Sequence, residues 1–161
     1  MPGSSHWVSH RLPRAGRLFG ATAYWTGTQV LFFGGSSCPP DAPCPPPIPS
    51  QPPAPVPSYN PATGRWKMLT GNVALSGGGP TVWTGRAVAV VNGGGNQGSF
   101  DTNTMLKLGD SAVFDPSTDH WLDLPPYPYG SLYNASAIWT GDSVIVWGGV
   151  YRGPSNGGVL S

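Results

Sequence analysis

The sequence predicts an all-β fold built from repeated four-stranded antiparallel sheets, and three observations support this. The tripeptide Trp-Thr-Gly occurs three times, with its tryptophans at the nearly equally spaced positions Trp25, Trp83 and Trp139. An apolar run rich in β-branched and aromatic residues follows each copy and ends at or beside glycines. A pattern of aromatic residue, Asn or Asp, Pro, turn and Trp ends at Trp66 and recurs, at almost the same interval, ending at Trp121. Long periods of this kind indicate stacked or radial repeats.

The composition favours short strands joined by turns. Charged residues make up only 9% of the chain, against roughly 25% in an average globular domain. The 24 Gly and 20 Pro would suggest disorder in a sequence without a period. Here the repeat is present, and 7 Trp, 6 Tyr and 5 Phe supply apolar surface that disordered chains lack.

Each Trp-Thr-Gly is expected to turn a β-hairpin, because Gly supplies the positive φ that tight hairpin turns need. The segments before the turn are short and partly alternating, and they span 19–24, 78–82 and 133–138. The segments after it are almost continuously apolar, and they span 29–33, 87–91 and 143–147. Such runs are typical of strands that are buried on both faces. The turn therefore joins the first two strands of each repeat.

Glycine pairs follow the apolar runs: Gly34-Gly35, Gly93-Gly94 and Gly148-Gly149. Adjacent glycines at a strand end imply either a backbone conformation or a close approach that a Cβ would forbid. The sequence leaves both explanations open.

Residues 58–66 and 113–121 match position by position and predict the third and fourth strands of each repeat. The Asn-Pro or Asp-Pro between the two halves predicts a type I turn. Asp115 and Asp119 bracket the second of these turns, where Asp side chains cap backbone N–H groups. The repeat is therefore a four-stranded antiparallel meander.

One further strand is expected at the start of the chain. The interval from Trp7 to Trp25 equals the interval from Trp121 to Trp139. Residues 1–10 are therefore expected to hold the last strand of an earlier repeat.

The order of apolar run, paired glycines, variable loop, aromatic-x-Pro and Trp resembles the kelch repeat of β-propellers. The resemblance covers nearly the whole chain, and the residues that carry it are Gly34, Gly35, Tyr59, Pro61, Trp66, Gly93, Gly94, Phe114, Pro116, Trp121, Gly148 and Gly149. The sequence departs from the pattern at Asn92, which takes the aligned first-glycine place, and at Phe114, which replaces Tyr. The repeats are also longer than the roughly 50 residues usual for kelch.

The resemblance implies a segment of a kelch-type β-propeller, in which each repeat is a radial blade. Residues 18–70 would form one blade with a Pro-rich insertion at 36–57, residues 78–125 another, and residues 132–161 the first half of a third. With residues 1–10 this makes eleven strands, about two and three-quarter blades. A ring needs about four to eight blades, so we expect a segment of a longer propeller with the remaining blades as partners. Two joined copies are the alternative, but their shared blade would lack a third strand.

In a propeller segment the long connections share one face, and binding residues concentrate in loops on a rigid scaffold. The candidate binding residues of this face are Arg17, Asn96, Gln97, Phe100, Tyr127, Tyr129, Tyr151 and Arg152. Ordinary loop packing is the competing explanation for each. No catalytic residue, metal or other cofactor is predicted, because no His/Tyr/Cys set or carboxylate pair converges in the sequence.

The charge and the cysteines limit which binding partners and which cellular compartment the sequence favours. The formal net charge is +1, with no basic stripe for nucleic acid. No apolar run approaches the roughly 18–20 residues needed to span a bilayer. Cys38 and Cys44 could form a disulfide in an oxidising compartment or remain two thiols inside a cell. The low charge and the cysteine pair favour an extracytoplasmic or secreted protein.

Three hypotheses about function follow. We expect a non-catalytic scaffold whose loop face binds a protein or a carbohydrate. The resemblance also admits part of a propeller enzyme, an oxidase, epimerase or lyase, with catalytic residues largely outside this segment. The third hypothesis is a truncated product that does not fold alone. The fold by itself does not decide among them.

Overall fold

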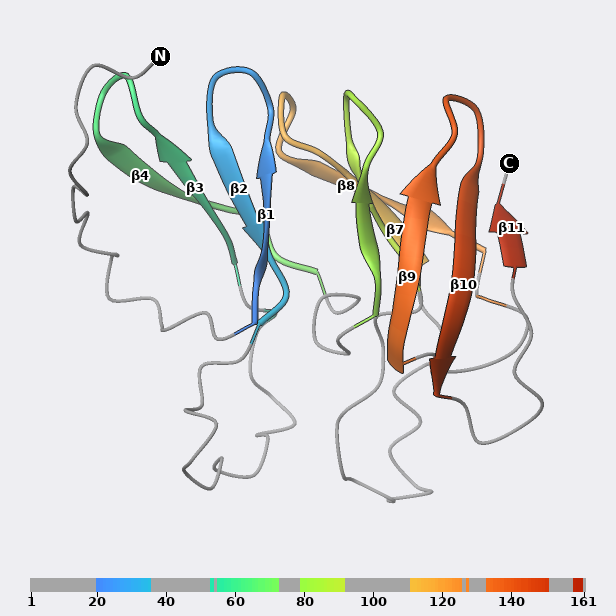
Figure 1. Cartoon of the computed structure of the whole chain (residues 1–161). Helices are drawn as coiled ribbons and strands as arrows, with labels where there is room; N and C mark the ends of the chain where they lie inside the picture. Colours follow the sequence, from blue (N-terminus) through green and yellow to red (C-terminus); the bar gives the residue numbers. More distant parts are fainter. Residues whose placement is uncertain are drawn as a thin grey trace, which may run out of the picture.

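The computed structural model describes residues 20–35, 53, 55–72, 79–91, 111–125, 127, 133–150 and 158–160. These residues form eleven strands and no helix (Figure 1). The strands are β1 Thr22–Trp25, β2 Val30–Phe33, β3 Val56–Asn60, β4 Arg65–Leu69, β5 Thr81–Trp83, β6 Val88–Val90, β7 Ser111–Asp115, β8 His120–Leu124, β9 Tyr133–Trp139, β10 Val144–Val150 and β11 Gly158–Leu160. They make three antiparallel sheets, ordered β1-β2-β3-β4, β5-β6-β7-β8 and β11-β10-β9. The all-β prediction is confirmed.

The two edges of the sheets differ in the length of their connections. The turns β1–β2, β3–β4, β5–β6, β7–β8 and β9–β10 are all short and equal in length, at 26–29, 61–64, 84–87, 116–119 and 140–143. Figure 1 shows them along its upper edge. The other connections are all longer and differ from one another, at 34–55, 70–80, 91–110, 125–132 and 151–157. We call these two sides the hairpin edge and the long-connection edge.

The Trp-Thr-Gly repeats form hairpin turns held by the threonine. In the first turn, the backbone N–H and the hydroxyl of Thr26 both donate to the carbonyl of Gln29, at 3.0 and 3.1 Å. The same hydroxyl accepts from the Gln29 N–H at 3.2 Å. Thr84 and Thr140 repeat this pattern with Ala87 and Ser143. The Thr hydroxyl donates to the same carbonyl as the Thr backbone N–H, and this second hydrogen bond explains why Thr recurs at this position.

The glycine of each triplet has a positive φ, as predicted: 98° at Gly27, 90° at Gly85 and 112° at Gly141. A Cβ at any of the three positions would meet no atom within 4 Å. The requirement for Gly is therefore conformational. Two of the paired glycines, Gly34 and Gly148, also have positive φ values, of 66° and 72°, and open space around the Cβ position. At these two positions too, the backbone conformation is what favours Gly.

The β3–β4 and β7–β8 hairpins match each other as the sequence predicted. The Asn60 carboxamide oxygen accepts from the N–H groups of Ala62 and Thr63 at 2.9 and 3.2 Å. The Asp115 carboxylate accepts from the Ser117 N–H at 2.9 Å. The predicted capping role of Asp115 is confirmed, because these side-chain oxygens satisfy N–H groups that the turn leaves without backbone partners.

The aromatic pairs after these turns also repeat. Tyr59 lies opposite Trp66 with ring centroids 4.8 Å apart, and Phe114 lies opposite Trp121 at 4.9 Å. Each pair is a cross-strand contact of the kind that stabilises antiparallel sheets. The recurring aromatic-x-Pro…Trp pattern is therefore a packing unit.

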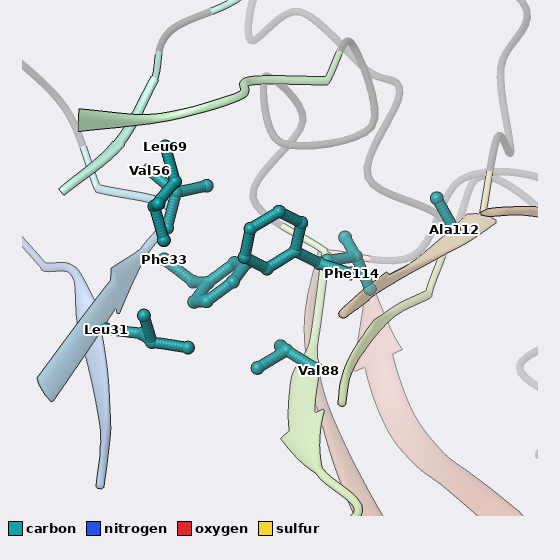
Figure 2. Packing of buried hydrophobic residues seen from close by; sticks show 8 residues of the cluster. Leu31, Phe33, Val56, Leu69, Val88, Ala112 and Phe114 are labelled. Carbon is teal, nitrogen blue, oxygen red and sulfur yellow. The ribbon is translucent and has the colours of Figure 1, made fainter. Parts of the chain in front are cut away.

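The sheets pack face to face around two apolar clusters. Leu31, Phe33, Val56 and Leu69 of the first sheet meet Val88, Val90, Ala112 and Phe114 of the second (Figure 2). Ala89 and Val91 of the second sheet meet Val144 and Val146 of the third, with Tyr127 among them. The second sheet is thus covered on both faces by its neighbours.

Burial on both faces was predicted for all three apolar runs. It is wrong for the first, where Val30 and Phe32 are only half-buried, and for the third. Residues 88–91 are buried throughout, but in β10 the side chain of Trp147 is 74% exposed. The first and third sheets lie at the two ends of the stack, and the described residues provide no further sheet to cover their outer faces.

The third sheet also corrects the expected number of strands. Two strands were predicted after residue 132, but β11 forms a third, with Val144 opposite Leu160 and Val146 opposite Gly158. Its three residues lack the aromatic-x-Pro mark that revealed β3 and β7. The strand expected within residues 1–10 lies outside the described residues.

Candidate functional site

Among the eight candidate binding residues, the structure describes Tyr127. It is 9% exposed and lies in the cluster between the second and third sheets. Its ring therefore packs between two sheets, and a role of Tyr127 in binding stays a prediction from the sequence. Loop membership was its only signal in the sequence, and that signal does not show which way a side chain turns.

The other candidates lie outside the described residues, as do the two cysteines and two glycines of the kelch pattern. They are Arg17, Asn96, Gln97, Phe100, Tyr129, Tyr151, Arg152, Cys38, Cys44, Gly93 and Gly94. The binding residues were predicted on the long-connection edge. The described residues show how the ends of one of its connections are held.

One anchor holds the start of the β4–β5 connection. The Asp119 carboxylate accepts from the Thr70 N–H at 2.8 Å, and the Trp121 indole N–H donates to the Thr70 carbonyl at 2.8 Å. Lys67 lies 3.7 Å from the second Asp119 oxygen. The second sheet thus binds both backbone groups of the residue that follows β4. Asp119 was expected to cap its own turn, but its cap joins two sheets.

The geometry of Asp119 depends on an uncommon backbone conformation. Its φ is 59°, and the aligned residue of the first sheet is Gly64, with φ of 67°. Asp tolerates this left-handed region better than most residues. The turn therefore keeps one shape in both sheets, while the second sheet gains a carboxylate that reaches its neighbour.

A second anchor lies at the start of β5. The Tyr24 hydroxyl donates to the Thr81 carbonyl at 2.6 Å and lies 2.8 Å from the Thr81 hydroxyl. Burial raises the pKa of Tyr24, and the hydrogen bond with Thr81 offsets part of the rise. The phenol stays protonated at neutral pH and acts as a donor. Both ends of the β4–β5 connection are thus tied to neighbouring sheets.

Two aspartates with shifted pKa values, Asp115 and Asp142, lie on the hairpin edge. Hydrogen bonds from the Ser117 hydroxyl and N–H lower the pKa of Asp115, and Arg86 at 3.5 Å adds a smaller effect in the same direction. Hydrogen bonds from Thr140 and Ser143 lower the pKa of Asp142. In the part of the chain that the structure describes, no three His, Cys, Asp or Glu side chains lie close enough to share a metal ion.

Replacing Asp115 by Asn is expected to flatten the acid side of the stability profile. The folded-state pKa of Asp115 lies below the value of about 3.9 for unfolded Asp, so the unfolded state binds more protons. Its contribution is present above the unfolded pKa and is lost as pH falls through the folded pKa. Asn keeps the cap, as Asn60 does in the first sheet.

Urea midpoints measured between pH 7 and pH 2 check this expectation. The wild type should lose more stability than Asp115→Asn as the pH falls through this range, and the two proteins should converge at the acid end. Parallel pH profiles would contradict the assignment. Asp123→Asn, on β8, serves as the control.

Comparison with known proteins gives a likeness in fold. The structure superposes on a solved structure titled "Structure of YjhT" with a TM-score of 0.61. The chain is similar in fold to YjhT. Sequence identity is 20%, and the match covers 88% of this chain and 48% of the YjhT chain. This chain therefore spans about half the length of YjhT.

No protein-family model and no curated protein matches the chain. Within the described residues, no helix has the length and hydrophobicity needed to cross a membrane.

Proposed function

We propose that this chain forms part of a kelch-type β-propeller and that its long-connection edge binds a protein or a carbohydrate without chemical conversion. The three sheets would be consecutive blades, as the kelch-like residue pattern implies. The half-length match to YjhT supports a propeller-like arrangement.

The observation that carries this proposal is the difference between the two edges. Every turn on the hairpin edge has the same short length, whereas the connections on the opposite edge vary from the shortest at 151–157 to the longest at 34–55. Uniform short turns favour a constant scaffold, and variable long connections favour a surface adapted to a ligand. Besides Tyr127, six candidate binding residues belong to the long connections, namely Asn96, Gln97, Phe100, Tyr129, Tyr151 and Arg152. These candidates and Arg17, which precedes β1, stay a prediction from the sequence.

The anchors fix the two ends of one long connection. Asp119 and Trp121 hold the backbone of Thr70, and Tyr24 holds Thr81, so the β4–β5 connection begins and ends at fixed points. A loop held at both ends loses less conformational entropy when it binds. This supports a part in recognition for the β4–β5 connection.

The proposal is tested by binding to arrays of glycans and of folded proteins, followed by titration of the best ligand. We expect saturable binding, with the recovered ligand unchanged in mass. Arg152→Ala should weaken this binding at least about fivefold, the effect of losing more than about 1 kcal/mol at an interface.

Arg86→Ala is the matched control, because it makes the same substitution in the β5–β6 turn on the hairpin edge. It should leave affinity within about twofold of the wild type. Equal losses in both variants would contradict a site on the long-connection edge. A ligand that is recovered chemically altered would favour the enzyme hypothesis.

A further inference from the structure

Two apolar faces at the ends of the stack lack a partner sheet among the described residues. The first end face belongs to the first sheet and contains the exposed Trp25, the half-buried Val30, Phe32 and Trp66, and Tyr59, which is 9% exposed. The second end face belongs to the third sheet and contains Ile138, Ile145 and Trp147. Trp25 is 53% exposed, Ile138 is 61% exposed and Trp147 is 74% exposed.

The repeat shows what the second end face is built to contact. When the three sheets are aligned on their Trp-Thr-Gly turns, Ile145 and Trp147 correspond to Leu31 and Phe33 of the first sheet. Those two are 0% and 1% exposed, because they pack against the second sheet. The corresponding residues of the second sheet, Ala89 and Val91, are also buried, against the third sheet. The corresponding face of the first sheet therefore packs on the second sheet, and that of the second sheet packs on the third.

The first end face is the matching surface. Trp25 corresponds to Trp83 of the second sheet, which packs against the first cluster, and to Trp139 of the third, which packs against the second. The cross-strand pair Tyr59–Trp66 corresponds to Phe114–Trp121. Phe33 packs on this second pair, with its ring centroid 5.9 Å from that of Phe114 and 6.3 Å from that of Trp121. The first end face thus repeats the surface that already receives a neighbouring sheet.

We propose that two copies of this chain associate head to tail, with the second end face of each copy packed on the first end face of the other. Trp147 of one copy would take the place on Tyr59 and Trp66 of the other that Phe33 takes on Phe114 and Trp121. The contact repeats an interface that the chain already forms twice between its own sheets.

Three further observations favour a closed pair over an open chain of copies. Head-to-tail contacts form a ring when the rotation closes, and three sheets from each of two copies make six, within the range of about four to eight for propellers. Two copies also supply nearly the whole length of YjhT, since one copy matches 48% of it. Finally, β11 supplies the third strand whose expected absence counted against joining two copies. The closed ring rests on the proposed propeller arrangement.

Sedimentation velocity over a concentration series tests this directly, and its readout is independent of any ligand. We expect a concentration-dependent species of twice the 16.8 kDa chain mass. Trp147→Glu and Trp25→Glu should each raise the dissociation constant at least about 30-fold, the loss expected for a buried aromatic anchor. Leu122→Glu is the matched control, because Leu122 is 67% exposed on the middle sheet and should leave association unchanged.

Mixing the two variants tests the head-to-tail geometry. Trp25→Glu keeps an intact second end face and Trp147→Glu keeps an intact first end face, so an equimolar mixture should form a dimer that neither forms alone. A wild type that is monomeric at every concentration would overturn the proposal, as would self-association of Trp25→Glu at the wild-type level. Circular dichroism of each variant, with Trp147→Gln as a milder substitution, separates lost association from lost folding.

Discussion

Phe33→Ala is expected to lower the free energy of unfolding by about 3–5 kcal/mol, the usual cost of deleting a buried Phe side chain. The Phe33 side chain is 1% exposed and lies between the first and second sheets (Figure 2). Its ring centroid is 6.0 Å from that of Tyr24, 5.9 Å from Phe114 and 6.3 Å from Trp121. The substitution therefore removes a contact that joins two sheets and leaves a cavity between them.

Because a whole domain is stable by only about 5–15 kcal/mol, we expect Phe33→Ala to lose a large fraction of the stability of the chain. Urea denaturation at a concentration where the wild type is monomeric measures the loss. Phe33→Leu keeps most of the volume and should cost less than about 1.5 kcal/mol. Leu122→Ala, at an exposed position, should stay within about 0.5 kcal/mol of the wild type. A loss below about 1 kcal/mol for Phe33→Ala, well under the usual cost, would contradict the packing of these two sheets.

The triple substitution Gly27→Ala, Gly85→Ala and Gly141→Ala is expected to destabilise the chain by about 1–3 kcal/mol at each position. The φ values of 98°, 90° and 112° lie in a region that residues with a Cβ rarely adopt. Since open space surrounds each Cβ position, the loss comes from backbone strain alone. The three turns belong to separate sheets, so their effects should add.

The three single variants and the triple variant, compared by urea denaturation, test this additivity. Thr28→Ala is the control, because it lies in the first of these turns and outside the positive-φ positions. Unchanged stability in the single variants would show that the turns accept other backbone conformations. A triple loss well below the sum of the singles would show that the turns are coupled.

Much of the fold follows from local chemistry. The Trp-Thr-Gly triplet specifies its turn because one hydroxyl and one positive φ suffice to close a short loop. The paired aromatic residue and Trp specify the second hairpin in the same way, because they are opposite each other across two adjacent strands. Such interactions join residues that are close in the sequence, so the sequence alone reveals their pattern.

The candidate site was less predictable. Tyr127 and Asp119 were placed by their position in a loop and a turn, yet one lies in the core and the other caps the neighbouring sheet. β11 was missed because its three residues carry no aromatic-x-Pro mark, and their pairing with β10 is what identifies them as a strand. The positions of Tyr127 and Asp119 depend on elements distant in the sequence.

The sequence by itself determined the repeat, the hairpins and the strand order within each four-stranded sheet, since these depend on periodicity and turn chemistry. Only the tertiary structure decided which faces are covered. Phe33 and Trp147 occupy the same position of the repeat, but one is 1% exposed and the other 74% exposed. The difference arises because burial depends on the presence of a neighbouring sheet, and a residue's own repeat does not encode its neighbour.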